Sequence, residues 1–181
     1  MRETYSMIIY CSKALMDALK ITKSDLASTE DIKDIDPLFG WHGHIAKKGG
    51  KNTIALMNVQ TMYLLLFRNK LPRNAEKFAS LIPEAMELTF EVNDINKPET
   101  EAYIQSMGPI IWAYAPDRQM TGNINRMFID MDYCHTHDFI EDQTIQPYEA
   151  VRFNKGIAKK DGIYVNPFEE MLSELCKLSA M

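Results

Sequence analysis

The stretch Thr53–Phe67, TIALMNVQTMYLLLF, is the most apolar part of the chain and determines what the rest has to cover. It is too short to span a bilayer, which takes about 20 apolar residues in a helix. Asn58 divides it into two short apolar runs, a pattern typical of strands rather than of one long helix. The stretch therefore predicts two buried strands that fold back on each other at a turn.

A further strand is expected just before this stretch. The residues KGGK at 48–51 are typical of a hairpin turn, because paired glycines readily adopt the positive φ angles that tight turns need. Ile45 begins the strand on the other side of that turn. In Met62–Phe67 the apolar residues are continuous rather than alternating, which indicates that both faces of the strand are covered. Together these segments predict an antiparallel meander of three strands.

The rest of the chain combines short apolar runs with helical patterns. Met7–Cys11 and Pro109–Tyr114 are runs of the β type, and in several other segments apolar residues recur every three or four positions. The order predicts an α+β fold with a single domain from residue 7 to 181 and an N-terminal extension of residues 1–6. We expect a mostly antiparallel sheet of four to five strands, covered by several helices.

The segment Met127–Phe139, MFIDMDYCHTHDF, fits two patterns. Its own residues alternate as in a strand, whereas the wider spacing of Ile124, Met127, Met131 and Cys134 fits one face of a helix. Methionine is more typical of helices than of strands. We therefore predict a helix here, with a strand as the alternative.

Composition and charge are those of an ordinary globular protein, with 46% hydrophobic and 25% charged residues. A net charge of -5 disfavours non-specific binding of nucleic acid, because such binding requires clustered Lys and Arg. Cys11, Cys134 and Cys176 show no metal or disulfide spacing, which favours the reducing cytosol. No signal peptide or transmembrane segment is recognisable, so association with a membrane is not expected.

Four motifs, taken in order, resemble one protein family. They are MIIYCSKALMDAL from Met7, DPLFGWHGH at Asp36–His44, RQMTGNIN at Arg118–Asn125 and YVNPFEEM at Tyr164–Met171. This order is similar to that in bacterial domain-of-unknown-function family 6933, whose members start with M-I-I-x-C-[ST]-K and carry a D-P-L-x-x-W segment. The resemblance implies no established activity. It supports a helix from Gly122 to about His137.

Two pairs of histidines raise the question of a metal site. His42 and His44 are two residues apart, so on a strand both imidazoles point to the same side and can ligate one ion. His135 and His137, beside Cys134, fall on the expected helix, where residues two apart diverge by about 200°. We therefore predict no metal and no other cofactor, and the alternative is a metal ion bound by His42 and His44.

A polar and aromatic group provides the candidate binding site. Arg118 follows an expected strand and precedes an expected helix, whose first N–H groups are free to bind an anion. The candidate ligand-binding residues are Trp41, His42, Arg118, Asn123 and Asn125. The alternative is that Arg118 pairs with a nearby Asp and that the two asparagines bond to backbone at the start of the helix.

No catalytic motif is recognisable, such as GxSxG or a Gly-rich phosphate loop. We therefore expect a cytoplasmic, non-enzymatic binding or interaction module with a protein or small-molecule partner. The alternative is a hydrolase or nuclease-like enzyme with a polar pocket around Arg118, Asn125 and His42. If these residues and Trp41 line one concave pocket, the enzyme is favoured, whereas scattered or core positions favour the module. An uncovered strand edge would also allow a homodimer.

Overall fold

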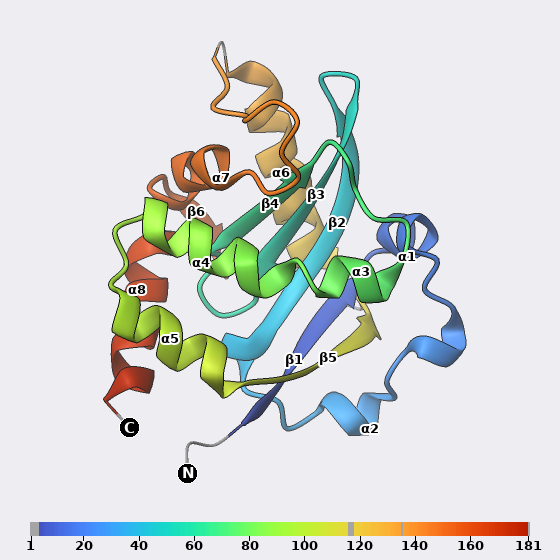
Figure 1. The fold of residues 1–181 in the computed structure, drawn as a ribbon, viewed down its shortest axis with the longest axis vertical. Coiled ribbons are helices and arrows are strands. Elements are labelled where there is room, and N and C mark those ends of the chain that lie inside the picture. Colours follow the sequence, from blue (N-terminus) through green and yellow to red (C-terminus); the bar gives the residue numbers. More distant parts are fainter. Residues whose placement is uncertain (1–3, 116–117, 135, 181) are drawn as a thin grey trace.

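The computed structural model describes residues 4–115, 118–134 and 136–180. Its centre is a five-stranded sheet with the strand order β4-β3-β2-β1-β5 (Figure 1). The strands are β1 Tyr5–Cys11, β2 Gly40–Lys48, β3 Lys51–Asn58, β4 Leu64–Arg68 and β5 Met107–Tyr114. A separate two-stranded hairpin consists of β6 Ala158–Lys160 and β7 Ile163–Val165.

Helices occupy most of the segments between and after the strands, which confirms the α+β class. They are α1 Lys13–Leu19, α2 Thr29–Ile32, α3 Ala75–Ala79, α4 Ile82–Val92, α5 Lys97–Ser106, α6 Arg118–Tyr133, α7 Pro147–Asn154 and α8 Pro167–Ser179. Two single turns of 3₁₀ helix, Lys23–Asp25 and Pro37–Phe39, lie in the connection from β1 to β2.

The sheet is mixed rather than mostly antiparallel. β1 runs parallel to both of its neighbours, β2 and β5, whereas β2–β3 and β3–β4 are antiparallel pairs. The expectation of a mostly antiparallel sheet is therefore wrong. The reason is that the chain leaves β1 through α1 and α2 and crosses back before it enters β2, and such a crossover places the two strands parallel. β1 also starts at Tyr5, inside the expected N-terminal extension.

Helices cover both faces of the sheet. On one face, Ile9, Leu56 and Phe67 pack with apolar residues of α1, α3, α4, α5 and α8. On the other face, Met57 and Leu64 pack with apolar residues of α6. Figure 1 shows α3, α4 and α5 in front of the sheet and α6 behind it. Because successive side chains of a strand point to opposite faces, β4 and most of β3 are buried on both sides, as their apolar sequence predicts.

Helix α6 decides between the two patterns of segment 127–139. It extends to Tyr133, so the prediction of a helix is confirmed for the first part of that segment. The buried residues of α6 follow helical spacing and face the sheet: Met120, Ile124, Met127, Phe128 and Met131. This stripe outweighs the local alternation, because a strand would leave part of these apolar side chains in water.

The outer edge of β4 is closed by a later part of the chain. Gln146 N–H donates to Leu66 O at 2.9 Å. Leu64 N–H donates to Asn154 Oδ1 at 2.7 Å, and Asn154 Nδ2 donates to Leu64 O at 3.0 Å. The buried backbone of β4 therefore finds its partners in residues 144–154, in the place where a sixth strand would pair.

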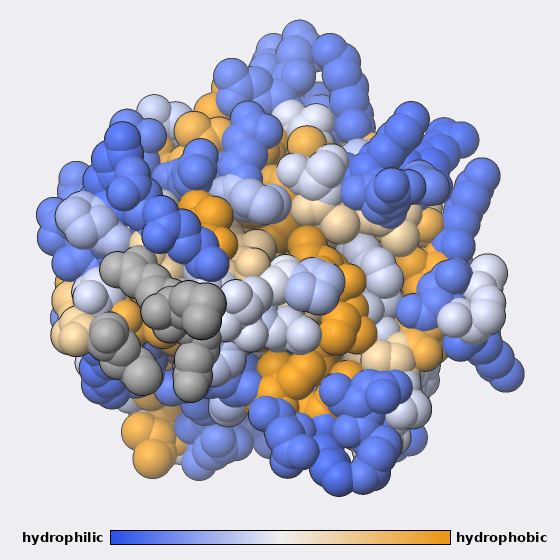
Figure 2. All heavy atoms as spheres, turned by 60° about the horizontal axis from the view of Figure 1, so that its bottom comes forward, coloured by the Kyte–Doolittle hydropathy of each residue, from blue (hydrophilic) through white to orange (hydrophobic). Residues whose placement is uncertain are grey.

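The opposite edge of the sheet is formed by β5. Ala27 N–H donates to Trp112 O at 2.8 Å, so one part of this edge is covered. Ile110 and Ile111 are only half-buried. Figure 2, which brings the bottom of Figure 1 forward, shows apolar residues exposed in the middle of a largely hydrophilic surface. A homodimer joined edge to edge would have to form at β5, because the edge of β4 is occupied.

Replacement of Asn154 by alanine should lower the free energy of unfolding. The change leaves the buried N–H and C=O of Leu64 without partners, and each such group costs about 1–3 kcal/mol. Urea unfolding should show a lower midpoint at a similar slope. The control is Asn52→Ala, the same change at an exposed position of β3, which should stay within about 0.5 kcal/mol of wild type. Equal midpoints for the two variants would contradict the role of Asn154.

Two glycine-to-alanine changes should have opposite effects on stability. A Cβ at Gly43 of β2 would lie 2.5 Å from Leu15 Cδ2 and 3.1 Å from Leu56 Cδ2, so Gly43→Ala should destabilise by about 1–3 kcal/mol. A Cβ at Gly122 of α6 meets nothing within 4 Å, so Gly122→Ala should stabilise by about 0.5–1 kcal/mol. Thermal unfolding measures both effects. A Gly43→Ala variant as stable as wild type would show that α1 does not pack closely on β2.

Candidate functional site

Trp41 lies in the core. Its side chain is 0% exposed, and its Nε1–H donates to the Tyr103 hydroxyl at 3.1 Å. β2 already begins at Gly40, so Trp41 is part of the sheet and does not line an open binding site as expected. The alternation along the strand turns this side chain to the face that α4 and α5 cover, away from its neighbour His42.

His42 and His44 point to the same face of β2, as two residues at i and i+2 of a strand do. His42 Nε2 is 2.9 Å from Thr121 Oγ1, and His44 Nδ1 is 2.7 Å from Ser12 Oγ. Asn125 hydrogen-bonds to the His44 side chain. His42 is 1% exposed, so its contact with Thr121 belongs to a closed interface between β2 and α6, whereas His44 is half-buried and its partner Ser12 precedes α1.

The other two candidates lie apart from this interface. Arg118 is exposed at the first residue of α6. Asn123 lines a cavity on the other flank of the same helix. Asn125 is exposed on α6 and bonds to His44. The structure therefore does not bring the five candidate residues into one pocket.

Among the residues that the structure describes, no three His, Cys, Asp or Glu side chains are grouped so that they could hold a metal ion. His42 and His44 share a face of β2 without a third ligand of this kind. His137 Nδ1 is 3.0 Å from Oε1 of the buried Glu149. His135 lies outside the described residues.

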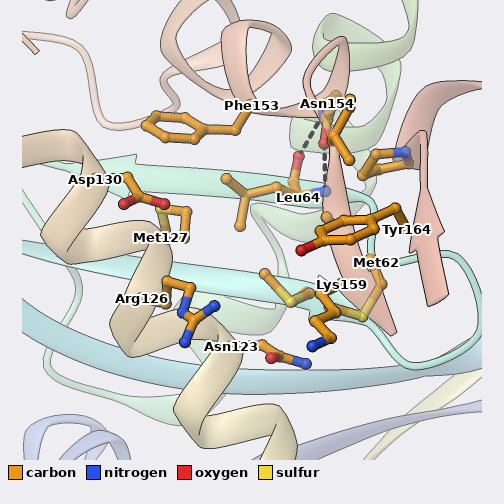
Figure 3. A pocket seen from close by; sticks show the side chains of 14 residues that line it. Met62, Leu64, Asn123, Arg126, Met127, Asp130, Phe153, Asn154, Lys159 and Tyr164 are labelled. Atoms are coloured by element: carbon orange, nitrogen blue, oxygen red, sulfur yellow. Dashed lines mark hydrogen bonds between the residues drawn. The ribbon is translucent and has the colours of Figure 1, made fainter. Parts of the chain in front are cut away.

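The cavity on the other flank of α6 has a volume of about 140 Å³ (Figure 3). Its walls come from α6, α7, the end of β3, the start of β4 and the β6–β7 hairpin. The main apolar lining residues are Met57, Met62, Leu64, Met127, Phe153 and Ile157. Besides Asn154, which bonds to Leu64, the polar lining residues are Asn123, Arg126, Asp130, Lys159 and Tyr164. Apolar walls with a few polar groups are typical of small-molecule sites.

Three hydrogen-bond donors lie along one side of this cavity. Asn123 Nδ2 is buried and has no partner in the described part of the chain. Arg126 is exposed at the mouth, and it forms no ion pair with any of the described carboxylates. Lys159 Nζ lies 5.8 Å from the centroid of the Tyr164 ring. Figure 3 shows Asn123, Arg126 and Lys159 on one side of the cavity and Phe153 on the opposite side.

The β6–β7 hairpin is held over the cavity by a small set of contacts. Lys160 Nζ donates to Gln60 O, and Gln119 Nε2 donates to Asp161 Oδ1 at 3.2 Å. Ala158 packs against the apolar cluster between α6 and the sheet. A two-stranded hairpin has little stability of its own, so its position depends on these contacts.

Wider hollows elsewhere on the molecule have charged residues among those that line them. The one between α4 and α5, of about 510 Å³, is lined by Glu87, Glu91 and Glu101, all of them exposed. These carboxylates are well solvated, and Ile95 is the one apolar side chain among the described residues that line this hollow. The cavity beside α6 is the better candidate because it combines apolar walls with an unpaired donor.

Sequence reasoning found Asn123 and missed the other polar residues of this cavity. Arg126 and Asp130 follow Asn123 at helical spacing along one flank of the apolar stripe, and this periodicity is the signal that could have identified them. Lys159 and Tyr164 reach the cavity through the β6–β7 hairpin. No spacing along the chain predicts their approach to α6.

Fold and cavity together define an α+β protein with a small, partly apolar cavity beside its sheet. The family model described as Domain of unknown function (DUF6933) matches residues 8–170, and the chain belongs to this family. The resemblance seen in the sequence motifs is thereby confirmed. No curated protein and no solved structure matches the chain. None of the helices in the described ranges has the length and apolarity needed to cross a membrane.

Burial lowers the pKa of His44 below its ordinary 6.5, against the opposing effect of its hydrogen bond with Asn125. As the pH falls through this value, the unfolded chain takes up a proton more readily than the folded protein does. The stability that neutral His44 contributes should therefore be complete above about pH 6.5 and decline below it. In His44→Gln, urea titrations should show a smaller loss of unfolding free energy between about pH 7 and pH 5. Identical pH slopes for wild type and variant would contradict this assignment.

Proposed function

We propose that this protein is a non-enzymatic binding module that holds a small molecule in the cavity beside α6. The observation that carries the proposal is Asn123, whose buried Nδ2 belongs to the cavity wall and has no partner among the residues that the structure describes. A buried donor without an acceptor costs about 1–3 kcal/mol, and a ligand that supplies the acceptor removes this cost. The apolar walls provide the remaining contact surface.

Binding suits the groups in this cavity better than catalysis does. None of the described residues that line it is a His, Cys or Ser, so a nucleophile with an adjacent imidazole base is not assembled there. His42 and His44 are engaged with Thr121 and Ser12, outside this cavity. This separation of the histidines from the cavity supports a module.

A hydrolase is the second candidate, and one group of contacts favours it. Ser12 Oγ is 2.7 Å from His44 Nδ1, and Asn125 hydrogen-bonds to His44, as in a chain of nucleophile, base and orienting residue. Ser12 also caps α1 by accepting from Leu15 N–H at 3.3 Å, which is a structural role of its own. A fluorophosphonate probe separates the two roles. Labelling of wild type that is lost in Ser12→Ala would favour the hydrolase.

We also propose that the protein works in a reducing compartment, the bacterial cytosol. Cys11, Cys134 and Cys176 are all free thiols. Burial raises the pKa of the Cys11 thiol to about 12, so this group stays protonated and unreactive. Unpaired structural thiols are typical of cytosolic proteins.

Filling the cavity tests the binding proposal. Ala158→Trp places an indole at a lining position, whereas Ile163→Trp places the same side chain on the same hairpin at a position that is 69% exposed and outside the cavity. In ligand-observed NMR with a library of small organic molecules, we expect binders of wild type and Ile163→Trp that do not bind Ala158→Trp. Equal binding to all three proteins would contradict the proposal, and so would the absence of any binder for wild type.

A further inference from the structure

We infer that the ligand of this cavity is a small monocarboxylate with a compact apolar body, such as a single ring, and this inference rests on the binding function proposed above. Size sets the first limit. An apolar cavity of about 150 Å³ accommodates benzene. The cavity beside α6 has about 140 Å³ and opens to solvent where Arg126 lies, so its inner part accommodates one ring or a short branched chain.

The inner walls require an apolar body. They are formed by the side chains of Met57, Met62 and Met127 and by the ring of Phe153. Met57 and Met62 are only 4% and 2% exposed. Methionine side chains adapt to the shape of a partner, and their sulfur atoms make favourable contacts with aromatic rings. A ring placed against these walls removes apolar surface of both partners from water.

The donors on the other side of the cavity determine the charge of the ligand. Asn123, Arg126 and Lys159 present an amide, a guanidinium and an ammonium group there (Figure 3). A carboxylate has two acceptor oxygens, so it can accept from the buried Asn123 Nδ2 and from a cation at the same time. Such charge-assisted hydrogen bonds are about twice as strong as neutral ones.

Asp130 is the one acidic residue among the described lining residues, and its place agrees with this assignment. Figure 3 shows Asp130 beside Met127, at a distance from Asn123 and Lys159. The lining carries two cations against one anion. The side with the donors therefore attracts a negative group, and Asp130 disfavours an anion at the opposite end.

Three probes of similar size and different charge test the inference: benzoate, benzyl alcohol and benzylamine. In isothermal titration calorimetry, benzoate should bind wild type at least about tenfold more tightly than the other two. Arg126→Gln should weaken benzoate by about tenfold and leave benzyl alcohol unchanged. Asn123→Asp replaces the amide by a carboxylate of nearly the same shape, and it should also weaken the binding of benzoate selectively. The control is Arg118→Gln, which removes an exposed cation of the same helix outside the cavity and should change nothing.

The outcomes separate this inference from the binding function itself. Equal affinity for benzoate and benzyl alcohol, or tightest binding of benzylamine, would overturn the monocarboxylate. Loss of that binding in Ala158→Trp would still show that the cavity is a binding site. Benzoate affinity that neither Arg126→Gln nor Asn123→Asp changes would overturn the assigned contacts. If none of the three probes binds wild type, the inference fails, and the library screen against Ala158→Trp and Ile163→Trp decides separately whether the cavity binds another class of molecule.

Discussion

The backbone of β4 has to find hydrogen-bond partners without water, and the rest of the structure depends on this constraint. β4 is buried on both faces and lies at the end of the sheet. Gln146 and Asn154 supply partners, the latter through its side-chain amide. The chain after α6 therefore returns along β4, and α7 ends beside that strand. The β6–β7 hairpin follows directly, and this brings it to the flank of α6, where the cavity forms.

Helix α6 separates two polar regions of different character. On one flank, Thr121 and Asn125 bond with the two histidines of β2, so these groups satisfy one another and hold the helix on the sheet. On the other flank, Asn123 Nδ2 has no acceptor within the described ranges, and Arg126 pairs with none of the carboxylates there. Polar groups that bond with one another in this way have a structural role. Donors that are left unpaired beside apolar walls support the proposal of a ligand site, and the proposed function is therefore assigned to the second flank.

Local sequence patterns predicted the features that depend on residues close together in the chain. The break at Asn58, the glycine pair at the β2–β3 turn and the apolar stripe of α6 each reflect near neighbours in the chain. Strand order is different, because the parallel pairing of β1 with β2 and β5 joins distant segments through crossovers. For the same reason Asn123 was found and Lys159 was not. Trp41 was chosen as a candidate because it stands among polar and aromatic residues, whereas the structure buries its side chain in the core.

Methionine methyl NMR tests the central claim most directly, because the chain carries its own probes. Of the 12 methionines, Met57, Met62 and Met127 line the cavity, whereas Met7 and Met86 are buried on the other face of the sheet. In a titration of carbon-13 methyl-labelled protein with benzoate, we expect saturable shifts of the three cavity methionines and unchanged signals from Met7 and Met86. Shifts centred on other methionines, or no shifts at all at saturating benzoate, would contradict the claim that this cavity is the ligand site.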